Sequence, residues 1–129
     1  MTKFNSSYDP PAPTARIAIR NPETGKRLKE IEMILDTGSD ITLLPRSSVD
    51  ILGVLPFGKA NYYLTGFDGS TVIAEVFTLQ AIFLGKRFTG NYCVLDDSIG
   101  ILGRDILNQL SILLDGPNLE WEEITTPPI

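Results

Sequence analysis

The alternation of apolar and polar positions becomes regular at residues 16–20, where Ile17 and Ile19 fall on one face of the chain. A period of two predicts a β-strand with one buried side. Residues 21–26 then supply the proline and glycine of a turn. The alternation resumes at 27–36 and changes to a continuously apolar run at 33–35, as in a strand that enters a core. The pattern predicts a hairpin whose second strand ends at Asp36.

Further segments are typical of strands because they are rich in β-branched and aromatic residues. They lie at 60–65, 70–85 and 86–97, and the Asp68-Gly69 pair between the first two suits a hairpin tip. Residues 111–123 indicate a strand, an Asp-Gly-Pro turn and a final strand. Helical spacing of apolar residues occurs at 103–110. We therefore predict an all-β fold with one short helix near the C-terminus.

Composition limits the classes of function. The chain of 129 residues suits one domain, which we expect over residues 15–124, after a flexible lead-in at 1–14 and before a frayed tail at 125–129. A net charge of −5 argues against a nucleic-acid partner, and no apolar run is long enough for a membrane partner. There is no secretory signal pattern, and the single Cys93 cannot form an internal disulfide, so we expect a cytoplasmic protein.

The sequence contains no histidine, which excludes Ser-His-Asp and Cys-His hydrolases and His-ligated metal sites. Carboxylates are therefore the leading candidates for catalysis. Asp96 and Asp97 are adjacent, but two such residues without further ligands indicate a solvated turn. We expect no metal and no cofactor.

Asp36 opens the segment Asp36-Thr37-Gly38-Ser39 directly after the apolar strand. Either the strand ends there and Asp36 faces water, or the carboxylate is held in a partly buried site for chemistry, since burying a lone charge is costly. Two neighbouring carboxyls that share one proton could supply a base and an acid for the hydrolysis of a peptide bond by water. Gly38 permits a tight turn beneath the carboxylate, and the Thr37 hydroxyl could lock that turn.

Two more segments follow Asp36 in order: the glycine-rich Gly66-Phe67-Asp68-Gly69, and Ile99-Gly100-Ile101-Leu102-Gly103-Arg104-Asp105, which joins an apolar strand to the predicted helix. With the Asp-Thr-Gly segment, they give a sequence that resembles the retroviral-type, or retropepsin-like, aspartic proteases from about Arg16 to Trp121. The resemblance implies a closed β-barrel with a flap hairpin, whose tip is the glycine-rich segment. It also implies an aspartic endopeptidase that acts as a two-fold homodimer on extended polypeptide. The motif occurs once in the chain, so the second carboxylate would come from Asp36 of a second copy.

The resemblance also assigns roles to individual residues. Asp36, Thr37 and Gly38 would be catalytic, with Thr37 in contact with its counterpart in the other subunit, and Arg104 would support the site by pairing with Asp40. The residues expected to bind substrate are Ser39, Asp40, Gly66, Phe67, Asp68, Gly69, Ile99 and Ile101. The polar Asp68 and Ser70 at the flap and the long C-terminus depart from the viral pattern.

Charge alternation near the two ends suggests how the dimer could form. Arg16 and Arg20 share one face of the first predicted strand, and Glu120 and Glu122 share one face of the last. We expect these strands to contribute opposite-charge pairs to the interface. The alternative function is a catalytically weak or inactive module of the same fold that dimerises and binds peptides, and a processing domain of a larger polyprotein is a further possibility.

Overall fold

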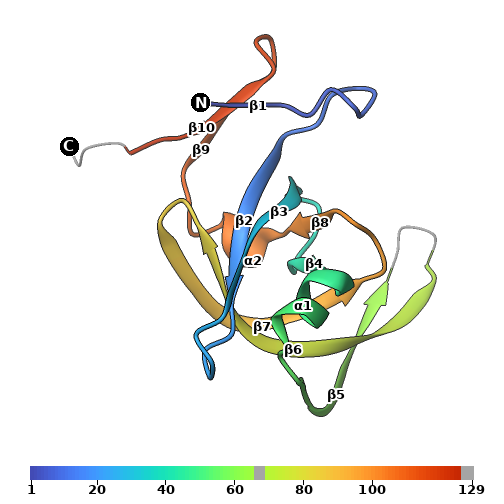
Figure 1. The fold of residues 1–129 in the computed structure, drawn as a ribbon. Coiled ribbons are helices and arrows are strands. Elements are labelled where there is room, and N and C mark those ends of the chain that lie inside the picture. The colour runs from blue at the N-terminus through green and yellow to red at the C-terminus, as the bar shows by residue number, and fades with distance from the viewer. Residues whose placement is uncertain (66–68, 126–129) are drawn as a thin grey trace.

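The main body of the protein is a closed β-barrel. The computed structural model describes residues 1–65 and 69–125 (Figure 1). Its barrel sheet contains β2 (Thr14–Arg20), β3 (Arg27–Leu35), β4 (Leu43–Pro45), β5 (Pro56–Thr65), β6 (Thr71–Phe83), β7 (Lys86–Leu95) and β8 (Gly100–Leu102). The strand order is β2-β3-β8-β4-β7-β6-β5, and β2 also pairs with β6, which closes six strands on themselves. The all-β barrel and the flap hairpin of β5 and β6 that were predicted are therefore confirmed as elements of the fold.

Alternating burial along β2 shows how the sequence forms this barrel. Ala15, Ile17 and Ile19 point inward and are buried, whereas Arg16 is exposed. They pack with inward residues of the other strands, such as Leu79. Opposite Ala18, β3 carries two residues, 29 and 30, because Ile17 pairs with Ile31 and Ile19 with Leu28. This bulge keeps apolar side chains on the inner face on both of its sides.

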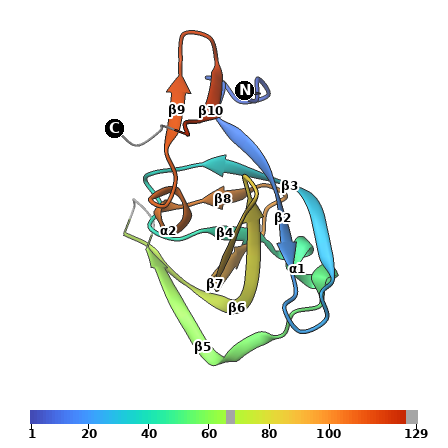
Figure 2. The same ribbon diagram turned by 90° about the vertical axis from the view of Figure 1, so that its left-hand side faces the viewer.

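A second, three-stranded sheet stands at one end of the barrel, as Figure 2 shows. It contains β1 (Thr2–Lys3), β9 (Ile112–Asp115) and β10 (Glu120–Glu123), in the order β1-β10-β9. Trp121 anchors it to the barrel, because its indole nitrogen donates to the carbonyl of Thr14 at 2.8 Å and its ring lies 5.9 Å from that of Phe83. Part of the lead-in predicted to be flexible is thus a paired strand, while the domain limits at 15 and 124 stay a prediction.

Within the described residues, two helices accompany the strands. The predicted C-terminal helix is α2 (Arg104–Leu107), shorter than the segment 103–110 that suggested it. The sequence pattern did not predict α1 (Arg46–Leu52), which follows Pro45 and is capped by Gly53 in a left-handed conformation. Val49 and Leu52 of α1 are buried against the barrel. Too few apolar positions lie in this single short segment for periodicity to reveal a helix.

Candidate active site

Asp36 lies directly after β3, at the end of a parallel pair of strands. Met33, Ile34 and Leu35 of β3 pair with Gly100, Ile101 and Leu102 of β8. The backbone N–H of Asp36 continues this ladder by donating to the carbonyl of Leu102 at 3.0 Å. Asp36 is half-buried at the end of β3. It is therefore neither fully exposed to water nor enclosed in the core.

The turn after Asp36 is closed by its own backbone. The N–H of Gly38 donates to Oδ1 of Asp36 at 2.8 Å, and the N–H of Ser39 donates to the carbonyl of Asp36 at 3.2 Å. A Cβ atom at Gly38 would lie 3.0 Å from Oδ1, so a side chain there would press on the carboxylate. The expectation that the Thr37 hydroxyl locks this turn is not met within the described residues, where that exposed hydroxyl forms no hydrogen bond.

The segment that begins α2 supports this loop. The N–H of Arg104 donates to the carbonyl of Ser39 at 2.8 Å, and its Nη1 donates to the carbonyl of Thr37 at 2.6 Å. Arg104 therefore holds the loop by backbone oxygens on both sides of Gly38. The expected ion pair with Asp40 does not form in this chain, where the ion pairs of the described residues involve other groups.

A buried hydroxyl adds a second support, which was not predicted from the sequence. Thr42 is fully buried; its Oγ1 donates to Oδ1 of Asp105 at 2.6 Å and accepts the N–H of Gly103 at 3.1 Å. The backbone N–H of Thr42 also donates to Oδ2 of Asp105, at 3.0 Å. The signal in the sequence was a single hydroxyl residue between Ile41 and Leu43, in an apolar segment destined for the core.

Two glycines of the same junction are required by space rather than by backbone conformation. A Cβ atom at Gly103 would collide with the carbonyl group of Ile41. One at Gly100 would collide with the side chain of Met33 and with the carbonyl oxygen of Leu43. Because backbone is the obstacle at Gly103, no rearrangement of side chains can relieve the collision. Gly103 allows the segment after Asp36 to lie directly on the end of β8, and Gly100 allows Met33 and Leu43 to pack closely against its start.

The Asp105 carboxylate also influences two buried side chains of β7. Burial and then the charge of Asp105 raise the pKa of the Cys93 thiol, and the same two causes raise the pKa of the Tyr92 hydroxyl. Tyr92 donates to the carbonyl of Phe88 at 2.6 Å. Both groups are neutral at physiological pH, so Cys93 behaves as a small apolar residue of the core.

Arg46, at the start of α1, joins two segments that border the site. Its Nε lies 2.6 Å from Oδ1 of Asp96, and its Nη1 lies 3.3 Å from Oε1 of Glu75 in β6. The bond with Asp96 is the main cause that raises the pKa of the guanidinium. Asp97 accepts the N–H of Ser98 at 2.7 Å, so the adjacent carboxylates stabilise a turn and a surface ion pair.

The remaining predicted residues lie on both sides of this loop. Ile101 is half-buried in β8, where it pairs with Ile34 and Leu43, and Ile99 is half-buried just before that strand. Gly69 has a φ of 82°, which a side chain would strain. Gly66, Phe67 and Asp68 lie outside the described residues.

No cluster of three or more potential metal ligands occurs in residues 1–65 and 69–125. None of the helices there has the length and apolar character to span a bilayer.

Comparisons with known proteins agree with this geometry. The family model described as aspartyl protease matches residues 22–106, from the first hairpin through the junction with α2. Among solved structures, EIAV protease in complex with the inhibitor HBY-793 is similar, with a TM-score of 0.55 and 24% identity over 76% of this chain and 86% of that one. A comparison with the sequences of curated proteins found no significant match. The family match covers more than half of the chain, and the structural match shows the same fold.

Proposed function

Because the chain belongs to the aspartyl protease family and has the retropepsin-like fold, we propose that it is an aspartic endopeptidase that acts as a homodimer. The single observation that carries the proposal is the half-buried Asp36, whose Oδ1 accepts the N–H of Gly38 while the surrounding loop is fixed to β8 and α2. The substrate would be an extended polypeptide with apolar side chains beside the scissile bond, near Ile99 and Ile101.

The mechanism needs two carboxyls that share one proton. In a dimer Asp36 and its counterpart would approach closely, and mutual repulsion would keep one of them protonated. The ionised carboxylate would take a proton from water as the water attacks the peptide carbonyl, while the protonated one polarises the carbonyl oxygen and later assists departure of the amine. This sequence consumes one water molecule and forms no covalent intermediate with the enzyme.

Two features of the chain support dimerisation. The Asp-Thr-Gly sequence occurs once, so a single copy offers only one such carboxylate. The exposed Thr37 hydroxyl has no partner within residues 1–65 and 69–125, which leaves it available to a second copy. Arg16 and Arg20, which the sequence suggested for the interface, contact Glu30 and Gln80 of their own chain, and their pairing with Glu120 and Glu122 stays a prediction.

The test is the cleavage of a diverse peptide mixture by wild type, Asp36→Asn and Asp50→Asn, followed by mass spectrometry from acid to neutral pH. Asp50 is an exposed residue of α1 and has no part in the hydrogen bonds of the Asp36 loop, so it serves as the matched control. We expect cleavage by wild type and Asp50→Asn and none by Asp36→Asn, since the asparagine amide cannot act as a base.

The rate should fall at a pH at which both carboxyls of the pair become ionised, with a profile that belongs to the pair. A rate that continues to rise into alkaline pH would contradict the shared-proton mechanism. Absence of cleavage by all three proteins, together with a dimer in solution that binds peptides, would assign the chain to the binding-module alternative.

A further inference from the structure

Positive charge is concentrated on one part of this acidic protein. Of its eleven Lys and Arg residues, seven lie at positions 16–29 and 86–87, where only one of the sixteen Asp and Glu residues, Glu23, occurs. These positions belong to the hairpin of β2 and β3 and to the start of β7. The rest of the chain therefore carries a strong excess of negative charge.

Strand register places several of these cations on the outer face of one sheet. Arg20 of β2 lies directly opposite Arg27 of β3, and cross-strand partners share a face. Ala18, two residues before Arg20, pairs with Ile82 of β6, which in turn pairs with Arg87 of β7. Lys29 belongs to the bulge opposite Ala18. We call Arg20, Arg27, Lys29 and Arg87 the basic face.

Few negative groups in the described parts of the chain neutralise the cations of the basic face. Arg27, Lys29 and Arg87 are exposed, and their side chains form no hydrogen bond or ion pair with the described parts of the chain. Arg20 donates only to the neutral amide oxygen of Gln80, at 3.0 Å. The nearby carboxylate of Glu30 is already paired with Arg16 at 3.2 Å.

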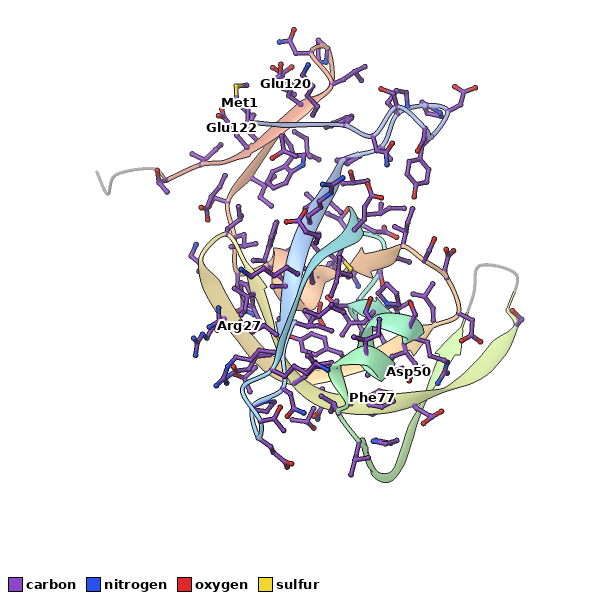
Figure 3. All side chains as sticks on the ribbon, in the orientation of Figure 1. Met1, Arg27, Asp50, Phe77, Glu120 and Glu122 are labelled. Atoms are coloured by element: carbon purple, nitrogen blue, oxygen red, sulfur yellow. The ribbon has the colours of Figure 1, made fainter. Side chains whose placement is uncertain are left out.

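This arrangement costs stability in the isolated chain. Like charges directly opposite each other on adjacent strands repel, as Arg20 and Arg27 do here. The face also lies far from Asp36, because Arg27 and Asp36 are at opposite ends of β3, roughly 30 Å apart for an extended strand. Figure 3 shows Arg27 at the end of the barrel opposite Glu120 and Glu122 of the terminal sheet. The basic face is therefore separate from the candidate active site.

We propose that the basic face binds an acidic segment of a partner polypeptide. Guanidinium groups bind carboxylates through paired, charge-assisted hydrogen bonds, and three arginines on the outer face of one sheet could bind successive acidic residues. A polypeptide is favoured over nucleic acid because a protein of net charge −5 with four clustered cations gains little from the release of phosphate counterions. This inference does not depend on catalysis.

The test measures binding of a fluorescein-labelled octapeptide of glutamate to the Asp36→Asn chain by fluorescence anisotropy, with an octapeptide of glutamine and an eight-nucleotide single-stranded DNA alongside. Adding Arg27→Gln and Arg87→Gln should raise the Kd for the glutamate peptide by about tenfold or more. The matched control adds Lys3→Gln and Arg16→Gln, which remove the same charge from cations that already face Glu120 and Glu30. The control should leave the Kd within about twofold.

Any of four outcomes would overturn the proposal. The glutamate peptide could fail to bind at low salt or bind equally well to both substituted proteins. DNA could bind more tightly than the peptide, which would assign the face to nucleic acid. Arg27→Gln with Arg87→Gln could instead change the sedimentation coefficient, which would show that the face is a contact between copies of this chain.

Discussion

The Thr42 hydroxyl connects the start of α2 to the loop that carries Asp36. It donates to Asp105 and accepts from the N–H of Gly103, and it has no access to water. Removal of this oxygen leaves a buried N–H without its acceptor, a loss that commonly costs about 1–3 kcal/mol. The position of Asp36 thus depends on a residue that never touches substrate in the proposed reaction.

Thr42→Val should lower the free energy of unfolding by about 1–3 kcal/mol and reduce kcat by about ten- to a hundredfold, because the loop shifts while the pockets remain. Thr89→Val, at an exposed position on β7, should change the free energy of unfolding by less than about 0.5 kcal/mol. Urea denaturation and steady-state kinetics measure both effects. Equal behaviour of the two variants would show that the Thr42 hydrogen bonds are not needed for the site.

The Cys93 thiol makes stability depend on pH. Its pKa is raised in the folded chain, so above its ordinary value of about 8.5 the unfolded chain loses a proton that the folded chain keeps. Stability is therefore complete below that pH and decreases as the pH rises. Urea denaturation between pH 7 and 10 should show this decrease, with a smaller slope for Cys93→Ala. A decrease of the same slope in Cys93→Ala would assign it to other groups, such as Tyr92.

The strand β6 belongs to two structures at once. Its C-terminal half pairs with β2 and closes the barrel, and its N-terminal half pairs with β5 in the hairpin. Arg46 contacts Glu75, at the junction of these halves, and also Asp96, in the turn before Ile99. Exposed ion pairs contribute little to stability, so we expect this contact to orient the hairpin rather than to strengthen the fold.

Arg46→Gln should change the free energy of unfolding by less than about 1 kcal/mol, raise KM for peptide substrates and speed amide exchange at residues 71–75. Arg16→Gln is the control, because it breaks an exposed ion pair with Glu30 that belongs to β2 and β3 and not to the hairpin of β5 and β6. A double-mutant cycle with Glu75→Gln should give effects on KM that do not add. Additive effects would mean that Arg46 and Glu75 act independently.

The sequence predicted the elements that local patterns encode. Alternation identified β2 and the start of β3, β-branched residues identified β6 and β7, and the Asp-Gly-Pro turn separated β9 from β10. It did not predict β4, which is only three residues long, or α1. The Asp36 loop was recognised from its motif, but the roles of Thr42 and Asp105 depend on a contact across 63 residues, which no local pattern contains.

The terminal sheet presents an open strand edge that suits a second copy. In the order β1-β10-β9, β9 has a neighbour on one side only, and its Leu113 and Leu114 are 44% and 52% exposed. Exposed apolar edge strands readily pair with another chain. We therefore place the proposed dimer contact at β9.

Leu114→Lys should raise the Kd of the dimer by about a hundredfold and reduce cleavage in proportion, since burying a charge at the contact is unfavourable. Leu55→Lys is the control, because Leu55 is 81% exposed just before β5. Analytical ultracentrifugation, with circular dichroism to verify folding, measures the outcome. A dimer constant unchanged in Leu114→Lys would exclude β9 from the contact.

The order in which the chain is synthesised has a consequence for the Asp36 loop. Arg104 holds the carbonyl of Thr37 across 67 residues of sequence, so the loop is translated long before its support. At ribosomal rates this interval is roughly 3–13 s. The pairing of β3 with the distant β8 also belongs to the slow class of folding steps. A nascent chain therefore carries the Asp36 motif before its supporting contacts can form. The loop can reach its folded conformation only when nearly the whole barrel has left the ribosome.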